Sequence, residues 1–180
     1  VIALADPDRV ARERLREELG VQYSFDDWRE LVHLNEVDAV VIATPVEIRE
    51  EIVRECVAAG KHIFSEKPAA KDLATTRRIR ELLAGGKVKY QLGFMRRFDP
   101  GYAYAYDQIR SGRIGDPVLI RLTSRDASGP PLSYVRTSGG LFVDSSVHDF
   151  DLSRWLMNDE VATVYAAGGR FVYPEYAEAG

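Results

Sequence analysis

Short apolar segments alternate with amphipathic segments throughout the first half of the chain, and this alternation constrains the fold more than any other feature. The apolar segments 1–5 and 38–43 are followed by segments 7–19 and 46–59, in which apolar residues recur at helical spacing. Strands that alternate with helices form right-handed β-α-β units, and such units build a parallel sheet. The first half is therefore predicted to be a doubly wound parallel sheet of Rossmann type.

Capping and turn residues set the limits of the predicted elements. Asp6 is expected to cap the first helix, with Pro7 at its first position and Gly20 at its end. The remaining elements expected in this half are helices over 26–32, 46–59 and 71–83 and strands over 1–5, 38–43, 61–65 and 88–94. Apolar strands of this kind are expected to be covered on both faces of the sheet.

After residue 94 the pattern becomes typical of an α+β domain. The elements expected there are helices over 99–111 and 143–157 and strands over 117–125 and 161–167. Because apolar and polar residues alternate, the sheet is expected to be open and mainly antiparallel. The predicted fold class is α/β: a partial Rossmann dinucleotide-binding domain over 1–94, then a partial α+β domain over 95–180. Strand-like segments at both margins would leave sheet edges unpaired, so an N-terminal part and a C-terminal part are expected to be missing from this sequence.

Composition and charge exclude several classes of function. The 24 Lys and Arg residues are outnumbered by 28 Asp and Glu residues, and the resulting net charge of −4 argues against a nucleic-acid partner. The single cysteine, Cys56, excludes a disulfide framework or a Cys-rich zinc site, and its apolar neighbours indicate a packed side chain. No apolar run approaches the roughly 18–20 residues that span a bilayer. We therefore expect a cytoplasmic globular protein without a metal site or a membrane partner.

Candidate ligand-binding residues follow the predicted strands, because ligands of open α/β sheets bind at the carboxyl ends of strands. Asp6 follows the first strand, where a carboxylate accepts hydrogen bonds from an adenosine ribose and repels the 2′-phosphate of NADP. This position is equally consistent with a helix cap, and Arg9 could weaken the exclusion of NADP. Thr44 and Pro45 follow a second strand, either as a ligand-binding turn or as the start of a helix. The Gly-rich turn of a dinucleotide site is expected roughly 20–25 residues before Val1.

Glu66, Lys67 and Pro68 follow the next predicted strand. A lysine at such a position can donate a hydrogen bond to a substrate oxygen and stabilise the negative charge that develops there. The alternative interpretation is a surface loop that carries a Glu–Lys ion pair.

Asp144, His148 and Asp151 form the most specific cluster of polar residues. Their spacing of four and then three residues would place them on one face of a continuous helix. A carboxylate beside an imidazole orients the ring and stabilises its protonated form, which suits a general base near neutral pH. The alternative is an acidic helix N-terminus with one solvated histidine. His33 and His62 lack such neighbours and are expected to be structural.

Taken in order, the motifs of the chain resemble those of the Gfo/Idh/MocA family of sugar and polyol oxidoreductases. The matching motifs are ALADPD at 3–8, ATP at 43–45, AGKHIFSEKP at 59–68, GFMRRFDP at 93–100, IGDP at 114–117, TSRD at 123–126 and SGGLFVDSSVHDFDLSRWL at 138–156. They cover nearly the whole chain, and GFMRRFDP, TSRD and SGGLFVDSSVHDFD are most similar to those of inositol 2-dehydrogenases. One departure is Arg49, where many relatives carry a histidine five residues after the threonine of the TP motif.

The resemblance implies an NAD-binding Rossmann domain and a second domain for substrate binding and oligomerisation, commonly as a homotetramer. It implies catalytic roles for Lys67, Asp144 and His148. The residues implied in cofactor binding are Asp6, Thr44, Pro45, Glu66 and Lys67, and those implied in substrate binding are Met95, Arg96 and Asp151. In this family the peptide bond between the lysine and the proline of EKP is often cis.

The expected function is therefore that of an NAD-dependent dehydrogenase, which oxidises a secondary hydroxyl group of a cyclic polyol, with myo-inositol as the first candidate, to a ketone. His148 is expected to act as the base. The alternatives are a dehydrogenase of another sugar or polyol and a non-catalytic regulator that senses the cofactor. Retention of all three catalytic residues argues against the regulator. Without the Gly-rich turn, residues 1–180 alone are expected to be inactive and to bind NAD weakly or not at all.

Overall fold

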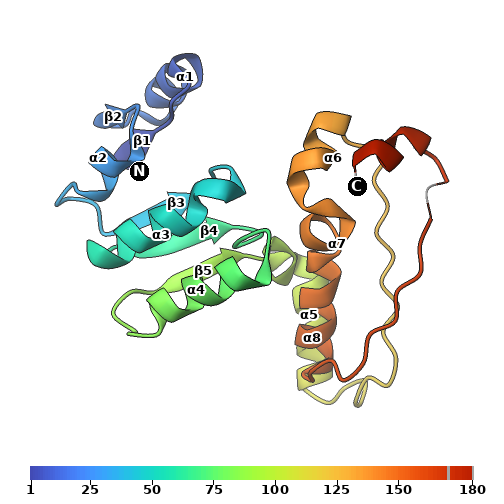
Figure 1. The fold of residues 1–180 in the computed structure, drawn as a ribbon. Helices are drawn as coiled ribbons and strands as arrows, with labels where there is room; N and C mark the ends of the chain where they lie inside the picture. Colours follow the sequence, from blue (N-terminus) through green and yellow to red (C-terminus); the bar gives the residue numbers. More distant parts are fainter. Residues whose placement is uncertain (170, 180) are drawn as a thin grey trace. The chain divides into compact units, whose positions relative to one another are not determined.

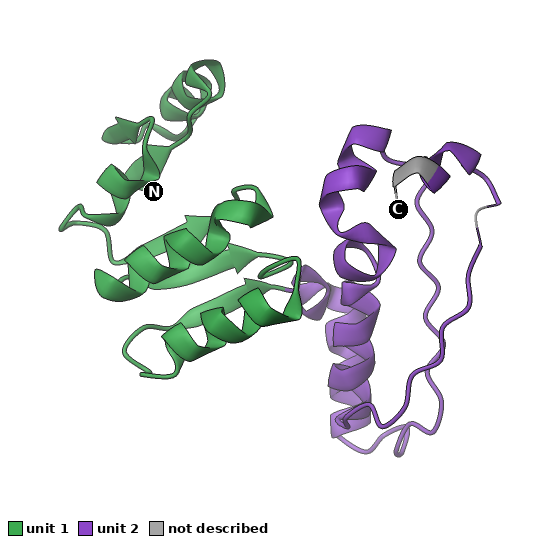
Figure 2. Cartoon of the chain, viewed as in Figure 1, with its two compact units in different colours: residues 1–93 green, residues 94–180 purple. Residues whose placement is uncertain are grey.

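The computed structural model describes residues 1–169 and 171–179 of the chain, which divides into two compact units (Figure 2). The first unit comprises residues 1–93 and the second residues 94–180. The strand–helix alternation of the sequence stops at this boundary. None of the helices in the described part of the chain could span a lipid bilayer.

The first unit consists of short parallel strands and the helices that connect them (Figure 1). The strands are β1 (Ala3–Ala5), β2 (Tyr23–Phe25), β3 (Ala39–Ile42), β4 (His62–Glu66) and β5 (Tyr90–Gly93). The helices are α1 (Arg9–Leu19), α2 (Trp28–Val32), α3 (Arg49–Ala58) and α4 (Leu73–Leu83), with a short 3-10 helix η1 (Val46–Ile48) before α3. β1 pairs with β2, and β4 lies between β3 and β5, all in parallel orientation. The predicted Rossmann-like parallel sheet with helices is confirmed, although β2 was not predicted as a strand.

The core of the first unit lies between the three-stranded sheet and the helices α3 and α4, which lie side by side on one face of it (Figure 1). Ile42 of β3 packs there with Val53 and Cys56 of α3, and all three are almost completely buried. Successive side chains of a strand point to opposite faces, and Val41 and Phe64 on the other face are 72% and 36% exposed. The expectation that these strands are covered on both faces was therefore wrong for the described structure.

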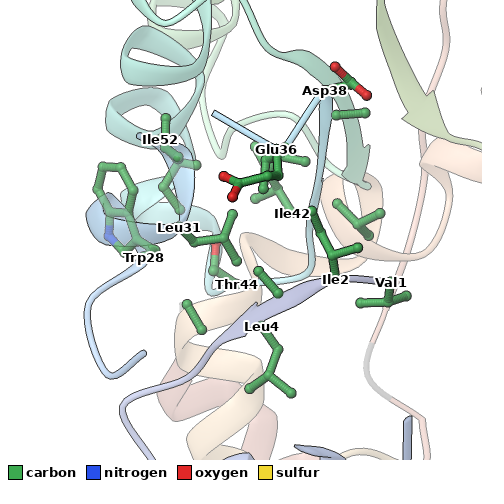
Figure 3. Close-up of a pocket in the computed structure, with 17 residues that line it drawn as sticks. Val1, Ile2, Leu4, Trp28, Leu31, Glu36, Asp38, Ile42, Thr44 and Ile52 are labelled. Carbon is green, nitrogen blue, oxygen red and sulfur yellow. The ribbon is translucent and has the colours of Figure 1, made fainter. Parts of the chain in front are cut away.

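The strands of the first unit form two separate sheets. A cavity of about 610 Å³ lies between β1 of one sheet and β3 of the other (Figure 3). Both strands line the cavity, together with Trp28 and Leu31 of α2. Thr44 also contributes to the lining, but most of the lining side chains are aliphatic. The cavity therefore has the character of a protein core, and Thr44 is the one candidate site residue in its lining.

Helix α1 begins two residues later than predicted, because Asp8 and not Asp6 caps it. Oδ1 of Asp8 accepts hydrogen bonds from the main-chain N–H groups of Val10 and Ala11, at 2.8 and 3.2 Å. The capping role predicted for Asp6 was therefore wrong. Gly20 ends the helix as predicted, in the left-handed conformation with a φ of 61°, which a residue without a Cβ adopts readily.

The regular elements in the described part of the second unit are all helices. Its elements are the 3-10 helix η2 (Met95–Phe98), α5 (Pro100–Arg110), α6 (Leu132–Ser138), α7 (Gly140–Asp144), α8 (Val147–Met157) and the 3-10 helix η3 (Pro174–Ala179). α5 packs against α8, and the ring of Tyr106 stacks on that of Trp155 with 4.3 Å between the centroids. α8 also contacts η2, so the motif at residues 93–100 lies beside the helix that carries His148.

The segments 117–125 and 161–167 were predicted as strands of an open antiparallel sheet, and both predictions were wrong for the described structure. Both segments run without strand pairing, with Val118 93% and Val164 83% exposed. An alternating pattern forms a strand where another strand supplies hydrogen-bond partners. The described residues of the second unit contain no strand, so the mainly antiparallel sheet is not formed within them.

Candidate active site

The candidate cofactor-binding residues of the first unit lie at the carboxyl ends of strands. Asp6 follows β1 directly, and Thr44 and Pro45 follow β3. Glu66 is the last residue of β4, and Lys67 comes immediately after it. Because β3 and β4 are neighbours in parallel orientation, the residues after β3 and those at the end of β4 lie at the same edge of one sheet. This is the edge at which ligands of open α/β sheets bind.

The Asp6 carboxylate lies in a tight turn after β1. Its Oδ1 accepts the main-chain N–H of Asp8 at 2.8 Å, and Arg12 donates from Nη1 to the main-chain oxygen of Asp6 at 2.6 Å. These hydrogen bonds fix the turn while the neighbouring Asp8 caps the helix. Asp6 is half-buried and lies at the carboxyl end of β1.

The side chain of Arg49, the first residue of α3, joins the ends of β3 and β4. Nε and Nη2 donate to the carbonyl oxygen of Thr44 at 3.0 and 2.8 Å, and Nη1 donates to the carbonyl oxygens of Glu66 and Pro68, at 2.5 Å each. Arg49 is only 7% exposed. Burial lowers the pKa of its guanidinium group, and the negative charge of Glu66 acts in the opposite direction. Sequence reasoning identified Arg49 only as a departure from the family pattern.

Lys67 lies in the loop that these carbonyl groups flank. It is half-buried, and its main-chain N–H donates to Oε2 of Glu66 at 3.2 Å. The Lys67–Pro68 peptide bond is cis, as the family resemblance predicted. Lys67 is therefore held from both sides. The Glu66 carboxylate accepts the main-chain N–H of Lys67, and the carbonyl oxygen of Pro68 accepts a hydrogen bond from Arg49.

Asp144 and His148 of the second unit were predicted to lie on one continuous helix, and this prediction was wrong. α7 ends at Asp144 and α8 begins at Val147, with Ser145 and Ser146 between them. The main-chain N–H of His148 donates to the carbonyl oxygen of Ser145 at 3.3 Å, which is three residues back in place of the helical four. Serine favours helix ends because its side chain competes for main-chain hydrogen bonds. The break thus falls at two residues that are compatible with a helix end.

His148 is nevertheless held in a defined environment. It is 6% exposed, and its ring meets the ring of Phe94 edge-on, with 6.2 Å between centroids and an interplanar angle of 83°. The solvated histidine of the alternative interpretation is thus excluded. Asp144 is half-buried, and its Oδ1 accepts a hydrogen bond from the hydroxyl of Tyr134 at 3.0 Å. Burial, followed by this hydrogen bond to Asp144, raises the pKa of Tyr134, so the phenol remains a donor.

The candidate substrate-binding residues Met95 and Arg96 lie in η2. Met95 is 59% exposed. Nη1 of Arg96 donates to Oδ1 of Asp149 at 2.5 Å, and the Ser124 hydroxyl donates to the same carboxylate at 2.9 Å. Asp149 thus orients the guanidinium group of Arg96. Neither Asp149 nor Ser124 was predicted, although Ser124 lies in the TSRD motif, which could have indicated it.

Asp151, the third candidate substrate-binding residue, is engaged by Arg97. The structure places Asp151 on α8, 7% exposed, and both of its carboxylate oxygens accept hydrogen bonds from the Arg97 guanidinium group. Arg97, the second arginine of the GFMRRFDP motif, thus binds Asp151 in this structure. Within the described residues, no group of three or more His, Cys, Asp or Glu is placed to hold a metal ion.

Two family domains match the chain. Residues 1–94 match an oxidoreductase family with an NAD-binding Rossmann fold, and residues 102–179 match the GFO/IDH/MocA C-terminal domain. The boundary between the two units thus lies at the end of the first match.

Characterised relatives match along almost the entire chain. It is 38% identical over 178 residues to myo-inositol 2-dehydrogenase of Thermotoga maritima, which covers 99% of this chain and 53% of that protein. It is 35% identical over 168 residues to scyllo-inositol 2-dehydrogenase (NAD(+)) of Bacillus subtilis, which covers 93% of this chain and 49% of that one. The chain therefore spans about half the length of these relatives.

Solved structures show the same similarity. A probable dehydrogenase from Thermotoga maritima superposes with a TM-score of 0.96 at 38% identity, over 100% of this chain and 55% of that chain. A scyllo-inositol dehydrogenase from Lactobacillus casei, with bound NAD(H) and scyllo-inositol, superposes with a TM-score of 0.86 at 35% identity, over 99% and 54% of the two chains. With both of its units matched in sequence and in structure, the chain belongs to the GFO/IDH/MocA family of oxidoreductases.

Proposed function

We propose that the protein is an NAD-dependent dehydrogenase that oxidises a secondary hydroxyl group of a cyclic polyol to a ketone, with myo-inositol as the first candidate substrate. The observation that carries the proposal is 38% identity to a myo-inositol 2-dehydrogenase over 99% of this chain. In support of it, Lys67, Asp144 and His148 are all present, and each occupies a buried or half-buried position.

The residues at the strand ends of the first unit fit NAD by the chemistry of their donors and acceptors. Asp6 offers a carboxylate for the hydroxyl groups of the adenosine ribose, and its charge disfavours the 2′-phosphate of NADP. Thr44, Pro45, Glu66 and Lys67 lie together at the carboxyl edge of β3 and β4, where they would hold the rest of the cofactor. When bound, NAD supplies the acceptor for the hydride that leaves the carbinol carbon.

The chain's own residues would handle the proton and the charge. His148 accepts the proton of the substrate hydroxyl group as the C–H bond breaks and the carbonyl group forms. Asp144, held by the hydroxyl of Tyr134, stabilises the positive charge that His148 gains. Lys67 donates a hydrogen bond to the same substrate oxygen and stabilises its developing negative charge.

The second unit would position the polyol. Met95 and Arg96 lie on η2, beside α8. Arg96, oriented by Asp149, offers N–H donors to substrate hydroxyl groups. Asp151 of α8 contributes by fixing the guanidinium group of Arg97, which follows Arg96 in η2. We further propose that the protein acts in the cytoplasm as a homotetramer formed through the second domain, which light scattering and cell fractionation test.

The test is NAD reduction by the natural protein containing this chain, with a panel of myo-inositol, scyllo-inositol and aldoses. Highest kcat/KM with an inositol supports the proposal, whereas highest kcat/KM with an aldose identifies a sugar dehydrogenase of the same family. Binding of NAD without turnover on any member of the panel would overturn the proposal and favour a regulator that senses the cofactor.

A further inference from the structure

One guanidinium group binds the main chain at the ends of two neighbouring strands. The four hydrogen bonds from Arg49 reach the carbonyl oxygens of Thr44, Glu66 and Pro68, over distances of 2.5–3.0 Å. The first of these carbonyl groups belongs to the turn after β3. The other two lie on either side of Lys67.

The planar shape of guanidinium explains why arginine suits this place. Its N–H groups point in fixed directions from one rigid plane, so a single side chain can bind several acceptors at once. A lysine ammonium group is a compact charge on a flexible stem, and a neutral imidazole has one N–H donor. Neither can reproduce the fork that Arg49 makes to Thr44 together with its bonds around Lys67.

The burial of Arg49 distinguishes it from an arginine that makes an ordinary surface contact. A charged group that is 7% exposed is unfavourable unless its donors are satisfied. Here the hydrogen bonds go to carbonyl oxygens at the sheet edge where the candidate cofactor residues Thr44 and Glu66 lie. The charge is thus used to fix main chain at the site.

We propose that Arg49 is a positioning residue, which holds the main chain on both sides of Lys67 and at Thr44 so that the Lys67 side chain and the cofactor-binding turn keep a fixed spacing. This inference rests on the proposed function of Lys67.

The main test compares Arg49→Lys and Arg49→His with the matched control Arg78→Lys in the natural protein. Arg78 also binds through a fork, to the Glu50 carboxylate, but it is exposed and contacts none of the three carbonyl groups. Misplacement of a reacting group by about 1 Å can cost about 10²-fold in rate. We therefore expect kcat to fall by about 10- to 100-fold in both Arg49 variants, and to stay within a few-fold of wild type in Arg78→Lys. If kcat in Arg49→Lys also stays within a few-fold, the proposal is wrong.

Hydrogen exchange distinguishes positioning from a general loss of stability, and it requires no activity. In Arg49→Lys, amide exchange should accelerate within 44–46 and 66–71, while that of α4 remains at the wild-type rate. Acceleration throughout the first unit, or none at 66–71, would contradict the proposal. If the wild-type protein oxidises no polyol, the proposed function fails, and hydrogen exchange still decides whether Arg49 holds the main chain around Lys67.

Discussion

Arg97 and Asp151 form a two-point ion pair, in which Nε donates to Oδ2 at 2.8 Å and Nη2 to Oδ1 at 2.5 Å. The side chain of Asp151 is 6% exposed, whereas that of Arg97 is 39% exposed. The hydrogen bonds that Arg97 donates to Asp151 raise the pKa of Arg97, which therefore remains charged. A buried carboxylate balanced in this way becomes unfavourable when its partner is removed.

Replacing Arg97 with leucine is expected to lower the free energy of unfolding by about 1–3 kcal/mol, because the Asp151 carboxylate stays buried and loses two donors. Partial exposure of Arg97 places the loss toward the lower end of that range. Urea unfolding followed by circular dichroism measures the change. The double variant Arg97→Leu/Asp151→Leu should recover part of the loss, because it also removes the buried charge.

Arg154→Leu serves as the control for this pair. Arg154 lies on α8, as Asp151 does. It makes a bidentate ion pair with Glu160, which is exposed to solvent. Exposed pairs contribute little to stability. A loss in Arg97→Leu no larger than that in Arg154→Leu would show that the Asp151 carboxylate does not depend on its partner.

Asp6 and Asp8 offer a matched pair of variants for cofactor choice. Asp6→Ala should weaken NAD binding and raise the ratio of NADP to NAD activity, because the carboxylate that repels a 2′-phosphate is removed. Asp8→Ala should leave that ratio unchanged and lower stability by about 0.5–2 kcal/mol through loss of the α1 cap. Steady-state kinetics with both cofactors measures the ratio. An equal ratio in both variants would exclude Asp6 from the ribose site.

His148→Gln is expected to lower kcat by about 10²–10⁴-fold, which is the usual contribution of a general base. The matched control is His33→Gln, since His33 is exposed. Its Nε2 lies 3.7 Å from Oε2 of Glu55. The kcat of this control should stay close to the wild-type value. NAD titration accompanies both assays, and unchanged turnover in His148→Gln with normal NAD binding would assign the base to another residue.

The buried thiol of Cys56 predicts a dependence of stability on alkaline pH. Burial raises the pKa of Cys56 from 9.0 to about 12. Between these values the unfolded thiol loses its proton while the folded thiol keeps it, so the free energy of unfolding falls as pH rises from about 9 toward 12. Urea unfolding at several pH values measures this slope.

Cys56→Ala provides the control, because it removes the titrating group. Its stability should be lower at neutral pH through the loss of packing, with a flatter decline above pH 9 than in the wild type. Iodoacetamide should label Cys56 slowly in the folded protein and rapidly in urea, since the thiolate is the reactive form. Equal labelling rates would contradict the burial of this side chain.

Apart from β2, the order of strands and helices in the first unit could be predicted from the sequence, because apolar residues recur there at the periods of strands and helices. The start of α1 was misplaced since Asp6 and Asp8 are both good capping residues, and local sequence does not determine which carboxylate accepts the helical N–H groups. The break after Asp144 was missed for a similar reason. Two serines permit a helix to continue as well as to end.

Contacts between distant residues had no local signal. Arg97 and Asp151 are separated by 54 positions, and Tyr134 and Asp144 belong to separate helices. The segment 117–125 illustrates the opposite error, because its alternation is a local pattern whose outcome depends on a pairing strand elsewhere. The positions of Asp6, Thr44 and Lys67 were predictable, since they depend only on where strands end.

Helix α3 carries Arg49 at its first residue and Val53 and Cys56 in the core. A closely packed interior transmits small displacements. A change in the volume of a core side chain of α3 is therefore expected to shift the whole helix and, with it, the guanidinium group of Arg49. Substitutions that raise thermal stability and substitutions that raise turnover are therefore expected to fall at the same positions of this chain. In directed evolution, Val53 is a residue at which selection for heat resistance would alter turnover without any contact to a ligand.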